Sequence, residues 1–179
     1  GVWHAFIGLC EALARSPVPV AAAITGHSPA GGAVLTLYCD YRIMADGPYR
    51  IGLNETQVGL VVPDVIQAAM RRLLGAHRAE RLMVAGAMIE SAEAHRIGLV
   101  DELIDAEHVV ERAIAWLRDL LRLAPHAMSE TRRIARADLR ALFAAHNATS
   151  DEAFLACWFS DEAQRVLGEM VAMLKAKRG

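Results

Sequence analysis

The sequence lacks cysteines in any recognisable pairing. Its three cysteines are an odd number, lie far apart and form no CxxC or Cys/His spacing (Cys10, Cys39 and Cys157). The spacing therefore predicts neither a disulfide framework nor a zinc site. Free cysteines persist in reducing compartments, so we expect a cytoplasmic protein without a metal.

An excess of charge of one sign is also missing. Nineteen Lys and Arg stand against twenty-one Asp and Glu, a net charge of -2, which argues against a nucleic-acid binder that works by phosphate neutralisation. No apolar run reaches the roughly 20 residues that a membrane-spanning helix needs, so we expect no membrane partner. What is present is a composition of 54% hydrophobic and 22% charged residues over 179 positions. That composition excludes intrinsic disorder and predicts one domain, or at most two.

Apolar periodicity predicts strands and helices in alternation over the first part of the chain and helices alone over the rest. The predicted helix over residues 2–14 ends at Ser16 and Pro17. Ser91 is a candidate N-cap for a short helix over residues 91–96. The region 126–177 has no strand signal and is predicted to form three helices. Further strands are expected over 18–24, 40–45, 49–53 and 99–104, and further helices over 33–38, 65–74, 79–85 and 107–123.

A glycine-rich loop joins a predicted buried strand to a predicted short helix at residues 24–32. Backbone N–H groups at a helix start attract negative charge, and Gly31 and Gly32 let a ligand approach the backbone closely. Aimed at a carbonyl oxygen, such N–H groups would form half of an oxyanion hole. The alternative is an ordinary tight turn, which the loop alone favours because it has no Walker or GxGxxG spacing.

Glu55 is the only charged residue between Arg50 and Asp64, in a segment rich in Ile, Leu and Val. Burial of an isolated carboxyl group raises its pKa, which suits a general base. A partly exposed loop residue or a cap near Asn54 explains the same pattern equally well.

Other candidates carry weaker signals. His27 follows the buried strand and could line a site, although a plain loop residue explains it too, and the other histidines are interpreted as surface or half-buried. Arg132, Arg133 and Arg136 are typical of a solvated helix face, with a phosphate-bearing ligand as the alternative. Four aromatic residues at helical spacing are typical of core or subunit interface rather than of a cofactor site (Phe143, Phe154, Trp158 and Phe159).

Taken together, the motifs resemble the enoyl-CoA hydratase/isomerase (crotonase) superfamily along essentially the whole chain. The resemblance rests on PVAAAITG at 19–26, AGG at 30–32, CDYR at 39–42, SAEA at 91–94 with GLVD at 98–101, and FSDE at 159–162. Within the superfamily, IGLNETQ at 51–57 is similar to the mitochondrial-type Δ3,Δ2-enoyl-CoA isomerases.

The resemblance implies an α/β fold, a crotonase-like (ClpP-type) spiral of ββα turns over 1–105, with a helical region over 106–179 that mediates trimers or dimers of trimers. It implies an acyl-CoA substrate in fatty-acid β-oxidation and no cofactor beyond the coenzyme A of that substrate. Gly31 would supply an oxyanion-hole N–H and Glu55 the catalytic carboxylate. The residues expected to touch substrate are His27, Ala30, Gly32, Val34, Asn54 and Leu60.

Val34 decides between the chemistries of the superfamily. An ungapped alignment through Gly31, Gly32 and Cys39 places it where the family's hydratases carry a second glutamate. A double-bond shift needs one base, whereas hydration also needs a second group to manage a proton. The favoured function is therefore isomerisation of 3-enoyl-CoA to 2-trans-enoyl-CoA. The alternatives are an enoyl-CoA hydratase or other acyl-CoA enzyme of this type, and a non-catalytic oligomeric scaffold of the same fold.

The chain starts at Gly1, within a predicted helix. By resemblance, family members extend further at the N-terminus, where a loop supplies a second oxyanion N–H and much of the adenine pocket. We therefore expect the sequence to be a fragment of a longer protein, and catalysis to be badly impaired if it is the whole.

Overall fold

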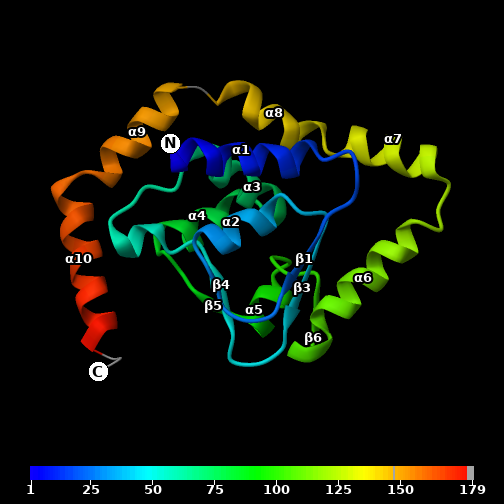
Figure 1. Cartoon of the computed structure of the whole chain (residues 1–179), viewed down its shortest axis with the longest axis horizontal. Helices are drawn as coiled ribbons and strands as arrows, with labels where there is room; N and C mark the ends of the chain where they lie inside the picture. Colours follow the sequence, from blue (N-terminus) through cyan, green and yellow to red (C-terminus); the bar gives the residue numbers. More distant parts are fainter. Residues whose placement is uncertain (147, 177–179) are drawn as a thin grey trace.

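The computed structural model describes residues 1–146 and 148–176, and it shows two small sheets enclosed by helices (Figure 1). One sheet has the order β1-β3-β6 and the other the order β2-β4-β5. The strands are β1 (Ala21–Ile24), β2 (Ser28–Pro29), β3 (Tyr41–Ala45), β4 (Arg50–Gly52), β5 (Ile89–Glu90) and β6 (Glu102–Ile104).

The chain passes repeatedly from the first sheet to the second and then into a helix. β1 pairs in parallel with β3, Ile24 opposite Met44, and β3 pairs in parallel with β6. β2 likewise pairs in parallel with β4, so consecutive turns of the chain stack one above the next. The consecutive apolar residues Ile43, Met44 and Ala45 of β3 are all buried, which suits a parallel strand that is covered on both faces. This is the predicted ββα spiral.

Helices surround the two sheets. α6 packs on β1 and β3, and α8 lies along α1, while α9 and α10 form an arm that leaves the body (Figure 1). The helices are α1 (Val2–Arg15), α2 (Gly31–Leu37), α3 (Asp64–Leu74), α4 (Ala76–Val84), α5 (Ser91–Arg96), α6 (Val109–Leu120), α7 (Pro125–Ala135), α8 (Ala137–Ala145), α9 (Ala148–Trp158) and α10 (Asp161–Ala176), with short 3-10 turns η1 (Glu55–Val58) and η2 (Ala106–His108). None of the described helices is long and apolar enough to cross a membrane.

Three details of the predicted elements are wrong. The C-terminal region holds four described helices instead of three, because the backbone turns at Arg136 (φ -103, ψ 14) between α7 and α8. Ser91 is the first helical residue rather than the cap, and its hydroxyl donates to the carbonyl of Gly47 at 2.8 Å. The strand predicted from residue 18 begins only at Ala21, because the N–H of Val20 donates to a side chain.

Arg132 in α7 and Arg136 at its C-cap do not lie on a solvated face. Arg132 binds both carboxylate oxygens of Asp40 at 2.8 Å, and Arg136 binds one of them at 3.1 Å. Arg136 is 6% exposed and also donates to the carbonyls of Tyr38 and Leu13, at the ends of α2 and α1. Cations are favourable at helix C-termini, so the pair fastens α7 to the core. Only Arg133, paired with an exposed glutamate, fits the prediction.

Candidate active site

A cavity of about 520 Å³ lies between the first turns of α1 and α2, the turn η1 and the helix α9. Glu55 contributes the only ionisable side chain among the described residues that line it. The other lining residues are glycine, alanine or larger apolar residues: Gly1, Val2, Trp3, Phe6, Ala30, Gly31, Val34, Val58, Leu60, Ile66, Leu155, Trp158 and Phe159.

The backbone before α2 is held in an unusual conformation at the edge of this cavity. Ala30 has φ 46 and ψ -118, and it is the only non-glycine residue with positive φ among the described positions. Its N–H donates to the carbonyl of Gly52 at 2.9 Å, and its carbonyl accepts from the N–H of Val34 at 2.9 Å. Such a conformation costs about 1–3 kcal/mol and is typical of functional sites. The conformation of Ala30 therefore indicates that the orientation of the peptide after it matters for the site.

That following peptide presents the N–H of Gly31. No backbone or side-chain acceptor within the described part of the chain takes this hydrogen. Gly31 lines the cavity, and a Cβ here would lie 3.5 Å from the ring of Phe6. Gly32 has a different role, since a Cβ there would approach the hydroxyl of Ser28 at 2.9 Å. Gly31 therefore offers a free donor to a ligand, and Gly32 permits the close packing behind it.

Glu55 enters the cavity from the start of η1. Its side chain is buried, at 8% exposure, and its Oε2 atom has no hydrogen-bond partner among the described residues. Burial raises the pKa of Glu55, and a hydrogen bond from the backbone offsets only part of that rise. A carboxylate that is poorly solvated and unpaired is a stronger base than one in water. Glu55 is therefore suited to accept a proton from a bound molecule.

The structure brings together most, but not all, of the predicted site residues. Five of the eight line the cavity, namely Ala30, Gly31, Val34, Glu55 and Leu60. His27 does not reach it: the ring is exposed, packs edge-on against Tyr49, and accepts from the N–H of Arg50 at 3.0 Å. Gly32 lies behind the wall, as described.

Asn54 precedes Glu55 but is not part of the lining. Its Oδ1 atom is buried and has no partner in the described structure. Asn54 is therefore buried beside the cavity-lining segment in sequence, without being part of the lining.

Two walls of the cavity were not predicted from the sequence. Trp3 and Phe6 come from α1, and Leu155 comes from α9, about 150 residues later in the chain. Trp158 and Phe159 were interpreted as core or interface, but they too line the cavity. The apolar periodicity of α1 was visible in the sequence, but periodicity identifies a buried face without identifying what covers it.

No group of three or more His, Cys, Asp and Glu side chains in the described ranges is arranged to hold a metal ion. The described residues bring to the cavity one carboxyl group, the free N–H of Gly31 and apolar walls.

Comparison with known proteins gives a consistent result. The family described as enoyl-CoA hydratase/isomerase matches residues 1–176. The human mitochondrial enoyl-CoA delta isomerase 1 is 32% identical over 180 residues, which cover 100% of this chain and 60% of that protein. A probable enoyl-CoA hydratase of Mycobacterium avium is 35% identical over 119 residues, covering 66% of this chain and 46% of the relative. The chain thus spans about three fifths of the human relative's length.

The fold agrees with a solved relative. The crystal structure of human mitochondrial Δ3-Δ2-enoyl-CoA isomerase superposes with a TM-score of 0.91 at 31% identity, covering 99% of this chain and 69% of that one. The predicted α/β crotonase-like fold is therefore confirmed. The division at residue 105, the trimeric assembly, the absence of a cofactor and the cytoplasmic location stay predictions.

Proposed function

Because the chain belongs to the enoyl-CoA hydratase/isomerase family, we propose that its cavity shifts the double bond of a 3-enoyl-CoA to the 2-trans position, as a step of fatty-acid β-oxidation. The observation that carries the proposal is the lining of the cavity. Glu55 is the only ionisable side chain among the described residues there, and Gly31 offers a free N–H at the same cavity. One base can carry both proton transfers of a double-bond shift, and the N–H of Gly31 supplies one of the oxyanion donors.

In the proposed reaction the thioester oxygen accepts a hydrogen bond from the N–H of Gly31. Glu55 takes a proton from C2, and the electron pair of that C–H bond spreads into a dienolate whose charge rests on the thioester oxygen. The C3–C4 double bond is lost and a C2–C3 double bond forms as Glu55 returns the proton to C4. No oxidant, reductant or water is consumed. One oxyanion donor contributes about 3–4 kcal/mol to such a step.

The apolar walls support isomerisation over hydration. Addition of water needs a second group to handle a proton. Val34 is 1% exposed and lines the cavity, and the resemblance implies that the family's hydratases carry a second glutamate at this position. An apolar site also keeps water from the reactive dienolate. Hydration is the second candidate, and the similarity to mycobacterial hydratases favours it. A non-catalytic scaffold is the third candidate, against which the unpaired carboxyl of Glu55 argues.

The test measures two reactions of one protein sample. Cis- and trans-3-enoyl-CoA should be converted to the conjugated thioester, while crotonyl-CoA should not be hydrated at a comparable rate. Addition of a chelator should leave the rate unchanged, because the proposed reaction uses no metal or other cofactor. Hydration of crotonyl-CoA at the faster rate would replace the proposal by its second candidate, and no turnover of either thioester would favour the third.

The proposal extends to assembly. We expect a homotrimer or a dimer of trimers, so light scattering should give three or six times the chain mass of 19.4 kDa. A monomer in solution would contradict this part of the proposal.

A further inference from the structure

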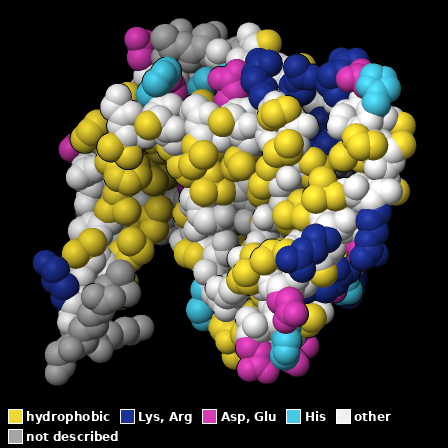
Figure 2. All heavy atoms as spheres, turned by 45° about the vertical axis from the view of Figure 1, so that its right-hand side comes forward, with side chains coloured by type: hydrophobic (Ala, Val, Ile, Leu, Met, Phe, Trp, Pro, Cys, Tyr) yellow, Lys and Arg dark blue, Asp and Glu magenta, His cyan; other side chains and the backbone are white. Residues whose placement is uncertain are grey.

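A second cavity, of about 300 Å³, lies where the end of α1 meets α7 and the start of α8. Figure 2 shows Lys and Arg side chains gathered along the upper edge of the molecule, where α7 and α8 run. The described lining of this cavity includes five arginines and one carboxylate: Arg15, Arg132, Arg133, Arg136, Arg140 and Glu130. A lining so rich in guanidinium groups is suited to an anion.

The positive charge of these arginines is only partly balanced. Three carboxylates pair with four of the five arginines, in the pairs Arg15–Glu11, Arg133–Glu130, Arg132–Asp40 and Arg136–Asp40. Asp40 therefore serves two cations at once. The side chain of Arg140 forms no ion pair or hydrogen bond with a described residue. Two positive charges at this cavity thus lack a counter-charge within the described chain.

Two guanidinium N–H groups of the lining are buried and have no acceptor among the described residues. They are Nε of Arg136 and Nε of Arg140. Arg136 as a whole is 6% exposed, although its other nitrogens bind Asp40 and two backbone carbonyls. A buried charged donor without an acceptor costs free energy, and buried polar groups are nearly always satisfied. An anion in this cavity would accept from both donors.

We propose that this cavity binds a small dianion of the phosphate class, with Arg136 and Arg140 donating to its oxygens and Arg15 adding charge. The two unbalanced positive charges match the two negative charges of such an ion. Guanidinium groups offer parallel N–H donors that fit the oxygens of phosphate, which an ammonium group does not. The volume is at the lower end of the range for small-molecule sites, so the ligand is a small one.

The proposed anion site is separate from the cavity that holds Glu55. The two cavities share no described lining residue. Trp3 and Phe6, near the start of α1, line the cavity of Glu55, whereas Ala14 and Arg15 line the anion site. The 14 residues of α1 rise by about 20 Å from one end of the helix to the other. The inference therefore does not rest on the proposed function.

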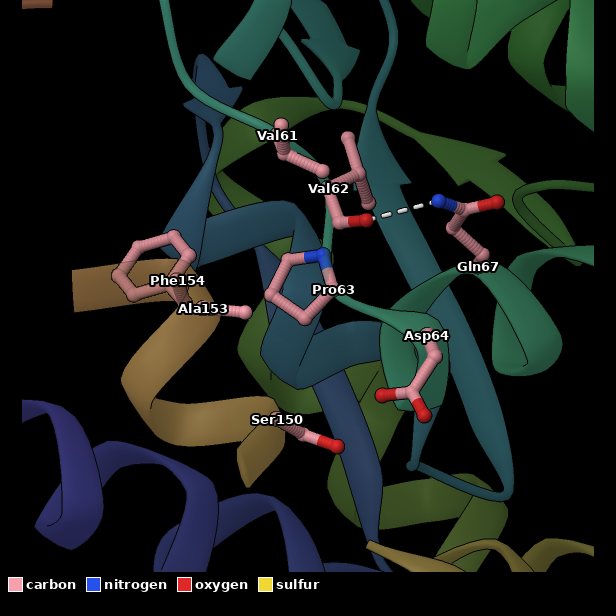
Figure 3. A pocket seen from close by; sticks show the side chains of 8 residues that line it. All are labelled: Val61, Val62, Pro63, Asp64, Gln67, Ser150, Ala153 and Phe154. Atoms are coloured by element: carbon pink, nitrogen blue, oxygen red, sulfur yellow. Dashed lines mark hydrogen bonds between the residues drawn. The ribbon is translucent and has the colours of Figure 1, made fainter. Parts of the chain in front are cut away.

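A third cavity shows that positive charge is not a general feature of the cavities of this protein. It lies between α9 and the loop before α3 and has a volume of about 400 Å³ (Figure 3). Its described lining contains no Lys or Arg, and its one ionisable side chain is Asp64. The amide of Gln67 there donates to the carbonyl of Val62 at 2.8 Å. A carboxylate in the lining disfavours phosphate, as Glu55 does in the first cavity.

Occupation of the anion site should stabilise the junction of α1, α7 and α8. The anion would join Arg15, at the end of α1, to Arg140 on α8. A ligand that binds only the folded chain raises its stability in proportion to the logarithm of its concentration above Kd. The melting temperature should therefore rise with phosphate concentration at constant ionic strength.

The experiment titrates the whole chain with inorganic phosphate in a calorimeter, at slightly alkaline pH and at an ionic strength held constant with sodium chloride. The unchanged protein should bind one phosphate per chain. Arg140→Gln removes a charge-assisted donor and should weaken binding about tenfold or more. Arg15→Gln, at an exposed position, should weaken binding about threefold, and it tests the site even if Arg140→Gln does not fold.

Two control variants change the net charge elsewhere. Arg118→Gln removes an exposed arginine of α6 that does not line the cavity and forms no hydrogen bond or ion pair with a described residue. Glu152→Gln removes an exposed carboxylate of α9 that is likewise unpaired within the described chain. Both should bind phosphate like the unchanged protein. Equal weakening in Arg118→Gln and Arg140→Gln would show only a general effect of net charge and would overturn the proposal.

Three further results complete the test. Absence of saturable phosphate binding, or a melting temperature that chloride raises as much as phosphate does, would overturn the proposal. Competition by butanoyl-CoA, at a concentration that saturates the cavity of Glu55, would show that the arginines hold the phosphates of coenzyme A, and would overturn a separate site. Glycerol phosphate distinguishes the two sources of the anion: tighter binding than inorganic phosphate assigns the site to the phosphate group of a larger metabolite, and weaker binding assigns it to the free ion. Phosphate binding that persists in a protein without isomerase turnover would leave the anion site standing while the proposed function fails.

Discussion

Replacement of Glu55 by glutamine removes the one ionisable side chain that the described residues contribute to the cavity. The described lining holds no second ionisable side chain that could take over, and the amide is neither a base nor an acid near neutral pH. A positioned general base contributes about 10²–10⁴-fold, and here the same carboxyl group serves both proton transfers. We therefore expect Glu55→Gln to lower kcat for 3-enoyl-CoA by about a thousandfold or more, which corresponds to roughly 4 kcal/mol of the barrier.

The same substitution should make the protein more stable at neutral pH. An unsatisfied buried polar group costs about 1–3 kcal/mol, and a charged one costs more. Oε2 of Glu55 is such an unpaired atom, so its replacement by a neutral amide of the same shape should raise the free energy of unfolding by about 1 kcal/mol.

The gain in stability has a defined pH dependence. Burial raises the pKa of Glu55 above its ordinary value of 4.5, so the folded protein holds this proton more tightly than the unfolded chain. The stability of the unchanged protein therefore falls as the pH rises from 4.5 through the folded-state pKa, and is constant above it. The difference from Glu55→Gln should vanish below 4.5, where both side chains are neutral, and be complete at alkaline pH.

Two measurements on one preparation check this reasoning. The rate is followed by the absorbance of the conjugated enoyl thioester, and stability by urea unfolding at several pH values, with Glu152→Gln as the control. Loss of turnover together with a gain of stability is the expected pair of results. Turnover within tenfold of the unchanged protein would refute the role of Glu55 as base, and a loss of stability at neutral pH would refute its description as an unpaired buried carboxylate.

Two further predictions concern the same site and its support. The rate of isomerisation should rise with pH as Glu55 loses its proton, because only the ionised form is a base. Burial raises the pKa of Glu55, so the midpoint of this rise should lie above 4.5. A stopped-flow or steady-state pH profile measures the midpoint, and a midpoint at or below 4.5 would contradict the prediction. Asp40→Asn leaves Arg132 and the buried Arg136 without their carboxylate. The free energy of unfolding, measured by urea titration, should fall by about 3–5 kcal/mol. A fall of less than about 1 kcal/mol would show that the helix-end carbonyls alone satisfy both cations.

Several features of the site could be predicted from the sequence because they depend on neighbouring residues. The isolation of Glu55 in an apolar segment is a local property, and it correctly indicated a buried carboxyl group with a raised pKa. The glycines at the start of α2 are local as well, since the strand, the turn and the helix start follow each other directly. The period of the apolar residues located most helices and strands for the same reason.

The sequence did not reveal which distant segments meet at the cavity. Asp151 and Trp3 are separated by 148 positions, and their 2.7 Å contact exists only because α9 folds back beside α1. His27 shows the reverse case, because a residue three positions before Ala30 points away from the cavity to bind the backbone of Arg50. His27 lies close to the site along the chain, but the pairing of β2 with β4 sets the direction of its side chain.

The sequence by itself determined the chemical groups, a single carboxyl group in an apolar segment and a glycine-rich strand-to-helix turn, because short-range sterics and solvation are encoded in neighbouring residues. Tertiary structure alone decided that Gly31 and Glu55 line one cavity and that Trp158 and Phe159 line it too. The physical reason is that apolar burial is non-directional. An apolar helix face must be covered, but only the packing of the whole chain decides whether protein or ligand covers it.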